Sequence, residues 1–298
     1  MIPAGRPQWP ARGRIGKVRG AMMRFAERLA AAVARNDSLL CVGLDPDPRR
    51  IPAQLGEGAE AVVAFNRAII EATADLACAY KPNLGFYLAY GAEGAAALAA
   101  TRRLIPPEIP VLLDCKVGDI STTAEAYARG YFDDWGFDAV TAQPYLGLDS
   151  LEPFLRRDDR AVFVLSRTSN PSAADFQDLP VERGGEVRPL FLRVAGQVGE
   201  WQARFGTCGL VVGATWPEQL AAVRQVCPEL PILVPGIGPQ QGELEATVRA
   251  GVKPDGTGLL INASRAISYA GSGPDFAAAA RKAAQDLREA INAVRRGV

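Results

Sequence analysis

Three charged residues gather at the end of one short apolar segment. Residues 111–113 predict a buried strand, and the hexapeptide DCKVGD follows directly, with Asp114, Lys116 and Asp119 as its charges. Side chains alternate along a strand, so Asp114 and Lys116 are expected on one face, roughly 6 to 7 Å apart along the strand, with Cys115 on the other. A fixed carboxylate and a fixed ammonium then share one pocket, which indicates an active site. The alternative is a solvated charge cluster at a strand end.

Two further charges follow earlier apolar segments in the same way. Asp45 comes after the segment that ends in Gly43-Leu44, and Lys81 lies in Tyr80-Lys81-Pro82-Asn83. Alone, Lys81 is as well explained as a cation that reaches toward solvent. Together with the charges of the hexapeptide, these residues place alternating acids and ammonium groups on three consecutive strands, where each acid is held ionised by a neighbouring cation.

A glycine-rich segment and an arginine predict a phosphate site. The segment PGIGPQQG, residues 235–242, follows an apolar run, and the backbone amides of Gly236 and Gly238 can approach an anion closely. The next apolar run ends in NASR, where Arg265 offers a guanidinium fork that suits phosphate. The alternative is a tight turn followed by a charge on a helix face.

The chain contains no histidine, which removes Ser-His and Cys-His nucleophiles and histidine metal sites. Its five cysteines lie at positions 41, 78, 115, 208 and 227 without a C-x-x-C pair, which argues against a disulfide framework and a structural zinc site. Any chemistry therefore depends on Lys, Asp, Glu, Arg and backbone amides, and we expect a reducing cytoplasm as the location.

Composition predicts a globular protein with an unusual start. The 298 residues carry 33 basic and 33 acidic side chains, so overall charge favours neither nucleic acid nor an anionic membrane as a partner. Residues 1–20 hold five basic residues and no acid, are rich in Pro and Gly, and lack the apolar stretch of a secretory signal. We expect a disordered basic tail there, with a transit peptide or a start at Met22 or Met23 as alternatives. Residues 21–298 are expected to form one catalytic domain, and no run is long enough to span a membrane.

Apolar, often β-branched segments alternate with longer helical patterns, as in βα units around a parallel sheet. This alternation predicts a (β/α)8 barrel with extra terminal helices, and a doubly wound open sheet is the alternative. The eight expected strands are residues 39–44, 78–81, 111–116, 139–143, 161–166, 209–214, 231–235 and 258–262. The expected helices include residues 23–34, 60–76, 94–104, 123–135, 217–226 and 275–294, with capping boxes at Thr122 and Thr215.

Six motifs carry a resemblance to a known family. In order, GLDPDPRRIP, AYKPN, LLDCKVGDI, SRTSNP, VPGIG and NASRAI resemble orotidine 5'-phosphate decarboxylase, in its longer bacterial branch, over nearly all of residues 38–272. The resemblance implies a homodimeric (β/α)8 barrel that needs no metal or organic cofactor. It implies that Lys116 protonates C6 of the pyrimidine, that Asp114 faces the substrate carboxylate, and that Asp119 is lent across the dimer interface. Asp45 and Lys81 match positions that hold the ribose and complete the charge array.

The resemblance also assigns the rest of the nucleotide site. Ser169 matches a serine that touches the pyrimidine, Gln240 a glutamine that reaches the phosphate, Arg265 the phosphate arginine, and Thr123 a threonine that accompanies the borrowed aspartate. Two positions depart from the family pattern. Ser172 replaces the usual glycine after Asn-Pro, and the segment PQQG replaces the commoner AQGG, so Gln241 is a second candidate for the phosphate contact.

Two other functions remain open at this point. The first is a metal-dependent sugar-phosphate lyase of the same suprafamily, which shares D-x-K-x-x-D but resembles enzymes with an acidic metal ligand where this chain has Lys81. The second is a barrel that binds a nucleotide without catalysis.

Overall fold

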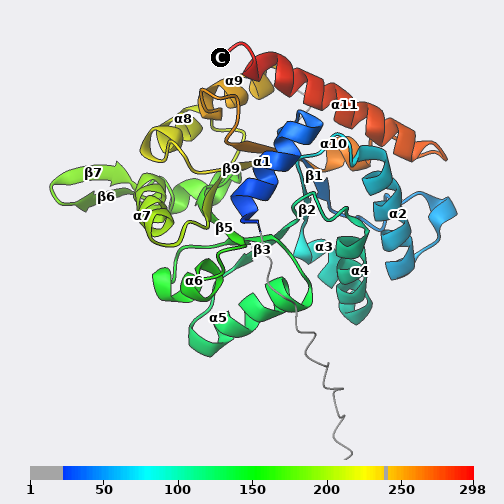
Figure 1. Ribbon diagram of the computed structural model, residues 1–298, viewed down its shortest axis with the longest axis horizontal. Helices are drawn as coiled ribbons and strands as arrows, with labels where there is room; N and C mark the ends of the chain where they lie inside the picture. Colours follow the sequence, from blue (N-terminus) through cyan, green and yellow to red (C-terminus); the bar gives the residue numbers. More distant parts are fainter. Residues whose placement is uncertain (1–22, 238–240) are drawn as a thin grey trace, which may run out of the picture.

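The computed structural model describes residues 23–237 and 241–298, and its main element is a (β/α)8 barrel (Figure 1). Eight parallel strands have the spatial order β2-β1-β10-β9-β8-β5-β4-β3. They are β1 Leu40–Leu44, β2 Ala79–Pro82, β3 Leu112–Val117, β4 Ala139–Ala142, β5 Ala161–Arg167, β8 Cys208–Val212, β9 Ile232–Pro235 and β10 Leu259–Ala263. All eight strands expected from the sequence are confirmed, with ends that differ by at most two residues.

The barrel closes between the two ends of this strand order, β2 and β3. Only two isolated parallel bridges join these strands, Tyr80 with Val111 and Asn83 with Asp114. Strands β1, β8 and β10 are buried at every position, as expected of strands covered on both faces. We call the line between β2 and β3 the closing seam.

Helices follow the strands and form the outer layer (Figure 1). They are α2 Gly58–Thr73, α3 Leu84–Leu88, α4 Gly91–Leu104, α5 Ser121–Ala128, α6 Leu148–Leu155, α7 Leu190–Phe205, α8 Pro217–Val226, α9 Gln241–Gly251, α10 Arg265–Ser268 and α11 Phe276–Arg295, with short 3-10 turns at η1 Ala53–Leu55 and η3 Pro171–Asp175. No helix among the described residues is both long and apolar enough to cross a membrane.

Helix α1, Phe25–Asn36, lies across the amino-terminal end of the barrel, and Figure 1 shows it in the middle of the ring of helices. The ring of Phe25 packs edge-on against Phe163 of β5. Arg28 pairs with Asp138, a buried carboxylate just before β4 that Arg102 and Arg160 also contact. Apolar packing and this ion cluster together hold α1 on the barrel.

Three local features differ from the expectations. The expected helix 123–135 is α5 followed by a π-helical segment, η2 Arg129–Asp134. Both predicted capping boxes are wrong: α5 begins at Ser121, before Thr122, and the residue that precedes α8 is Trp216, without a side-chain cap. The antiparallel strands β6 Pro180–Arg183 and β7 Glu186–Pro189 were not expected, and they form a hairpin that projects from the barrel (Figure 1). The predicted tail, residues 1–20, lies outside the described residues.

Candidate active site

Asp114 is the centre of a hydrogen-bond network at the carboxyl end of β3. Its Oδ2 accepts from Lys81 Nζ at 3.0 Å and from Asn83 Nδ2 at 3.2 Å. Its Oδ1 accepts from Lys116 Nζ at 2.7 Å and from Thr141 Oγ1 at 2.9 Å. The carboxylate is thus held by two ammonium groups and two neutral donors that come from three adjacent strands.

The electrostatics of this network keep Asp114 and Lys81 ionised. Burial raises the pKa of Asp114, but the charges of Lys81 and Lys116 and their hydrogen bonds lower it by a larger amount. The net pKa of Asp114 therefore lies well below the ordinary value. Lys81 is only 3% exposed, and burial lowers its pKa, yet Asp45 and Asp114 raise it to a net value above the ordinary one. The site therefore holds a negative and a positive charge at fixed positions.

The backbone of β3 is irregular where it carries these charges. Its pairing with β4 shifts register between Leu113 and Val117, and Lys116 has a left-handed backbone with φ of 47°. A bulge of this kind re-aims side chains at the end of a strand. Cys115 packs against the hydrophobic core, and its thiol contacts the carbonyl of Thr141, whereas Lys116 and Asp114 are hydrogen-bonded to each other.

Asp45 joins the network from β1. Its Oδ1 accepts from the backbone N–H of Asn83 at 3.1 Å, and the Tyr269 hydroxyl donates to its backbone carbonyl at 3.1 Å. The same hydroxyl accepts from the N–H of Asp47. The loop after β1 is therefore fixed from both sides, and Asp45 lies beside Lys81.

Asp119 and Thr123 are not part of this network within one chain. Asp119 Oδ1 accepts from the N–H of Ile120, and no ion pair joins Asp119 to Lys116 among the described residues. Thr123 lies on the exposed face of α5 and lines a cavity of about 350 Å³ with aromatic residues that include Tyr127 and Trp135. Within the part of the chain that the structure describes, Asp114 is thus the acid that pairs with Lys116, and Asp119 does not join it.

Ser169 lies against the ends of two further strands. A methyl group added at Gly213, just after β8, would be 2.7 Å from Ser169 Cβ, and one at Gly236, just after β9, would be 3.8 Å from Ser169 Oγ. Gly236 has φ of 93°, a conformation that favours glycine. Three loops at the carboxyl ends of the strands therefore meet around Ser169.

The predicted phosphate residues are described only in part. Arg265 is the first residue of α10 and is exposed, and the preceding Ser264 lies over Gly43, where an added methyl would be 2.6 Å from Ser264 Cβ. Gly238 and Gln240 lie outside the described residues. The side chain of Gln241, the second glutamine candidate, is likewise outside them.

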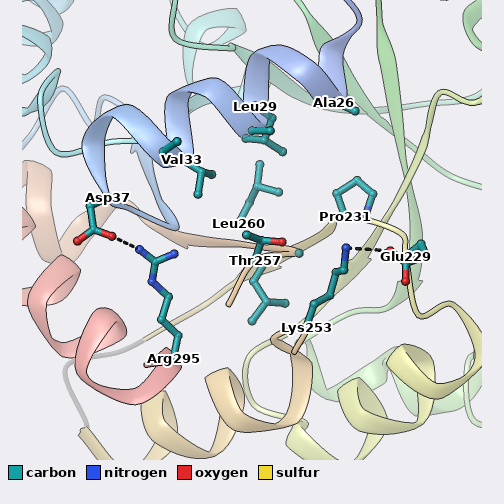
Figure 2. Close-up of a pocket in the computed structure, with 14 residues that line it drawn as sticks. Ala26, Leu29, Val33, Asp37, Glu229, Pro231, Lys253, Thr257, Leu260 and Arg295 are labelled. Atoms are coloured by element: carbon teal, nitrogen blue, oxygen red, sulfur yellow. Dashed lines mark hydrogen bonds and ion pairs between the residues drawn. The ribbon is translucent and has the colours of Figure 1, made fainter. Parts of the chain in front are cut away.

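Figure 2 shows a different cavity, of about 390 Å³, at the opposite end of the barrel. Leu29 and Val33 of α1 face Leu260 across it, and the ion pairs of Asp37 with Arg295 and of Lys253 with Glu229 lie at its two sides. None of its 14 lining residues belongs to the predicted site. This cavity is therefore separate from the charge network at the carboxyl ends of β2 and β3.

The arrangement offers fixed charges and a proton donor. Among residues 23–237 and 241–298, no group of three or more His, Cys, Asp and Glu side chains is arranged to hold a metal ion. Lys81 occupies the space between Asp45 and Asp114. The array can stabilise charge that develops on a bound molecule, and Lys116 can donate a proton to it.

Sequence reasoning did not select Asn83 or Thr141. Asn83 directly follows β2, and a polar residue at that position is the signal that could have identified it. Thr141 is the one hydroxyl in β4, whose other residues are Ala139, Val140 and Ala142. Its contact with Asp114 depends on how β3 and β4 pair, which a single sequence does not specify.

Comparison with known proteins gives one consistent result. Residues 38–283 match the model of the orotidine 5'-phosphate decarboxylase / HUMPS family. Orotidine 5'-phosphate decarboxylase of Thermomicrobium roseum is 57% identical over 93% of this chain and 98% of its own, and that of Roseiflexus castenholzii is 53% identical over 93% and 100%. The structure of Leishmania donovani OMP decarboxylase is 44% identical, with a TM-score of 0.81 over 92% of this chain and 99% of its own.

Proposed function

The chain belongs to the orotidine 5'-phosphate decarboxylase / HUMPS family, and from this premise we propose that it is a carboxy-lyase that converts orotidine 5'-phosphate to uridine 5'-phosphate and carbon dioxide. The observation that carries the proposal is the Asp114 carboxylate held between Lys81 and Lys116 at 3.0 and 2.7 Å. This reaction is the last step in the synthesis of the pyrimidine nucleotide. It needs fixed charges of the kind that this site holds in place.

The chemistry explains why such charges are needed. When the bond between C6 and the carboxylate breaks, the electron pair stays on C6 in an orbital that cannot delocalise into the ring. With no electron sink in the substrate, the protein must stabilise the carbanion electrostatically. The Lys116 ammonium fills this role and then donates a proton to C6, and solvent returns the proton to the amine.

Asp114 is proposed to face the substrate carboxylate. Its low pKa keeps it ionised, so it holds Lys116 in place and repels the carboxylate in the ground state. The repulsion is relieved when carbon dioxide leaves, so it favours the transition state. Asp45 and Lys81 are proposed to bind the ribose, and Lys81 keeps the two acids apart.

The remaining nucleotide contacts are assigned to the loops that meet at Ser169. Ser169 is proposed to contact the pyrimidine, and Gly236, Gly238, Gln240 and Arg265 to bind the phosphate. Binding energy from this remote dianion then supports loop closure over the ring, which raises the rate of the chemical step. The meeting of Ser169 with Gly236 and the exposed position of Arg265 support the assignment.

We further propose a homodimer in which Asp119, with Thr123, completes the partner's site. Exposed apolar side chains lie on the segments that follow β3 and β4: Ile120, next to Asp119, is 54% exposed, Tyr127 is 40% exposed, and Tyr145 in the loop before α6 is 91% exposed. Large apolar side chains left exposed in one chain are available for a protein interface. Asp119 forms no ion pair with residues 23–237 or 241–298 of its own chain, which supports a cation supplied by the other chain.

The proposal is tested by a decarboxylation assay of the wild-type protein and of the Lys116→Ala variant. Purified protein is incubated with orotidine 5'-phosphate in the presence and absence of EDTA, and the ultraviolet absorbance of the orotate ring is followed. We expect full activity with EDTA and a loss of at least about 10⁴-fold in kcat for Lys116→Ala, since both charge stabilisation and proton donation are removed.

Two outcomes would contradict the proposal. Activity that EDTA abolishes would favour a metal-dependent lyase of the same suprafamily. Tight binding of a uridine phosphate with no change in orotate absorbance would favour a nucleotide-binding barrel without catalysis.

A further inference from the structure

Thr141 of β4 replaces a ladder hydrogen bond that the bulge in β3 removes. The two strands pair normally at Leu112 and Leu113, lose register, and meet again at Val117. In the gap, the backbone N–H of Lys116 donates to Thr141 Oγ1 at 2.9 Å. The side chain of Thr141 is buried, with 1% of the residue exposed, so water does not compete for this contact.

Only one arrangement of the Thr141 hydroxyl satisfies both of its partners. The backbone N–H of Lys116 can only donate, so the hydroxyl oxygen accepts that hydrogen bond. The single proton of the hydroxyl is then left for Asp114 Oδ1, 2.9 Å away. Thr141 therefore connects the backbone of the proposed proton donor with the carboxylate that orients its ammonium.

We infer that Thr141 is a positioning residue of the reaction, which holds the Lys116 backbone in its left-handed conformation and Asp114 in the rotamer that faces Lys116. This inference rests on the proposed function. A left-handed backbone is unfavourable for a lysine and persists only where surrounding contacts enforce it. Thr141 supplies the contact to the N–H of that residue, and it acts on the substrate only through Lys116 and Asp114.

Loss of the Thr141 hydroxyl should also change the pH dependence of kcat. Asp114 is surrounded by Lys81 of β2, Lys116 of its own strand and Asp45 after β1, and Thr141 donates to its charged form from β4. Removing that donor destabilises the ionised carboxylate, so the acid limb of kcat must move to higher pH. A purely structural residue would leave this limb in place.

The experiment compares three variants. Thr141→Val keeps the volume and removes the hydroxyl, Thr141→Ser keeps the hydroxyl, and Thr207→Val removes a buried hydroxyl that bonds the Leu155 carbonyl at 2.9 Å, away from the site. For Thr141→Val we expect kcat to fall about 10- to 100-fold with KM within twofold, the loss typical of one hydrogen bond to a charged group. Its acid limb should rise by about one pH unit.

The controls decide whether the effect is local. Thr141→Ser should recover kcat to within about threefold, and Thr207→Val should keep wild-type kcat even if its Tm falls as far as that of Thr141→Val. A Thr141→Val enzyme with wild-type kcat and acid limb, or a Thr207→Val enzyme with an equal loss of kcat, would overturn the inference. If Thr141→Val does not fold, Thr141→Cys is judged by the same measurements.

A crystal structure of Thr141→Val separates this inference from the proposed function. We expect Lys116 to leave the left-handed region and its Nζ to move away from Asp114. If wild-type protein does not decarboxylate orotidine 5'-phosphate, the proposed function fails, and the crystal structure still decides the role of Thr141. An unchanged φ and an unchanged distance between Lys116 Nζ and Asp114 Oδ1 would refute it.

Discussion

Lys81 separates two acids that would otherwise repel each other in a nearly dry site. It is almost fully buried, it bonds Asp114, and the charges of Asp45 and Asp114 hold its pKa above the ordinary value. Removing one partner of a buried ion pair leaves the other uncompensated, which costs far more than the pair contributes in net stability. The stability of this protein is therefore tied to its charges at the site.

We expect Lys81→Met to lower the free energy of unfolding by about 3 to 5 kcal/mol and to abolish decarboxylation. The pKa of Asp114 is lowered in the folded state, so its stabilisation is present above its ordinary pKa of 3.8 and is lost as pH falls below that value. The difference in free energy of unfolding between wild type and Lys81→Met should therefore become smaller below pH 4. Urea unfolding between pH 3 and 7 measures both effects.

Lys282→Met is the matched control for this experiment. Lys282 pairs with Asp286 one turn away on α11, and its side chain is 71% exposed. An exposed pair of this kind contributes less than about 1 kcal/mol. An equal loss of stability in the two variants would show that removing the buried Lys81 charge costs no more than removing an exposed one.

At the residue scale, sequence reasoning identified the charges but not the neutral groups between them. Asp45, Lys81, Asp114 and Lys116 are charged residues at strand ends, a pattern visible in one dimension, and the structure brings all four together. Thr141 acts through the register of two strands, and a threonine among small apolar residues looks like any other strand residue. Whether Asp119 meets a cation depends on a second chain, so it stays a prediction.

Glycines at strand ends determine how closely the loops of the site approach one another. Gly213 follows β8, and a methyl group there would be 2.7 Å from Ser169 Cβ and 2.8 Å from Ser169 backbone atoms. Backbone atoms cannot rotate away as a flexible side chain can. Glycine is therefore needed at position 213 for the loop after β5 to lie this close to the end of β8.

We expect Gly213→Ala to raise KM for orotidine 5'-phosphate about tenfold, because the displaced loop moves Ser169 away from the pyrimidine, and to cost about 1 to 3 kcal/mol of stability. Gly196→Ala in α7 is the control, since its added methyl would meet only a Val226 side chain atom, at 3.9 Å. This helix substitution should stabilise by up to about 1 kcal/mol with unchanged kinetics. Steady-state kinetics and thermal unfolding of both variants test the prediction, and a wild-type KM for Gly213→Ala would contradict it.

At the element scale, buried strands were predictable because each is a continuous apolar run. The hairpin of β6 and β7 was not, because its strands are largely exposed and their residues show no apolar alternation. The π-helical segment after α5 was also not predicted, because hydrophobic periodicity does not distinguish it from a continued α-helix. These two elements depend on tertiary contacts rather than on local pattern.

The proposed dimer makes catalysis a property of two chains, which leads to a test by complementation. Lys116→Ala and Asp119→Ala homodimers should each be nearly inactive. After mixing in equal amounts with subunit exchange, half of the dimers are mixed, and each mixed dimer has one site with an intact lysine and an intact aspartate. We therefore expect the mixture to recover about a quarter of wild-type activity, measured by the orotate absorbance assay. A mixture that stays inactive although mass spectrometry detects mixed dimers would place Asp119 outside the partner's site.

The closing seam between β2 and β3 is the place where few backbone contacts hold the barrel closed. Lys81 and Asn83 lie on one side of this line and Asp114 on the other, and besides their contacts only two single bridges join the strands there. The groups that we propose to act in the reaction thus also hold the barrel closed. We expect heating to open this seam and to part the Lys81 ammonium from its carboxylate while the surrounding helices are still wound, so that activity is lost at a lower temperature than the fold.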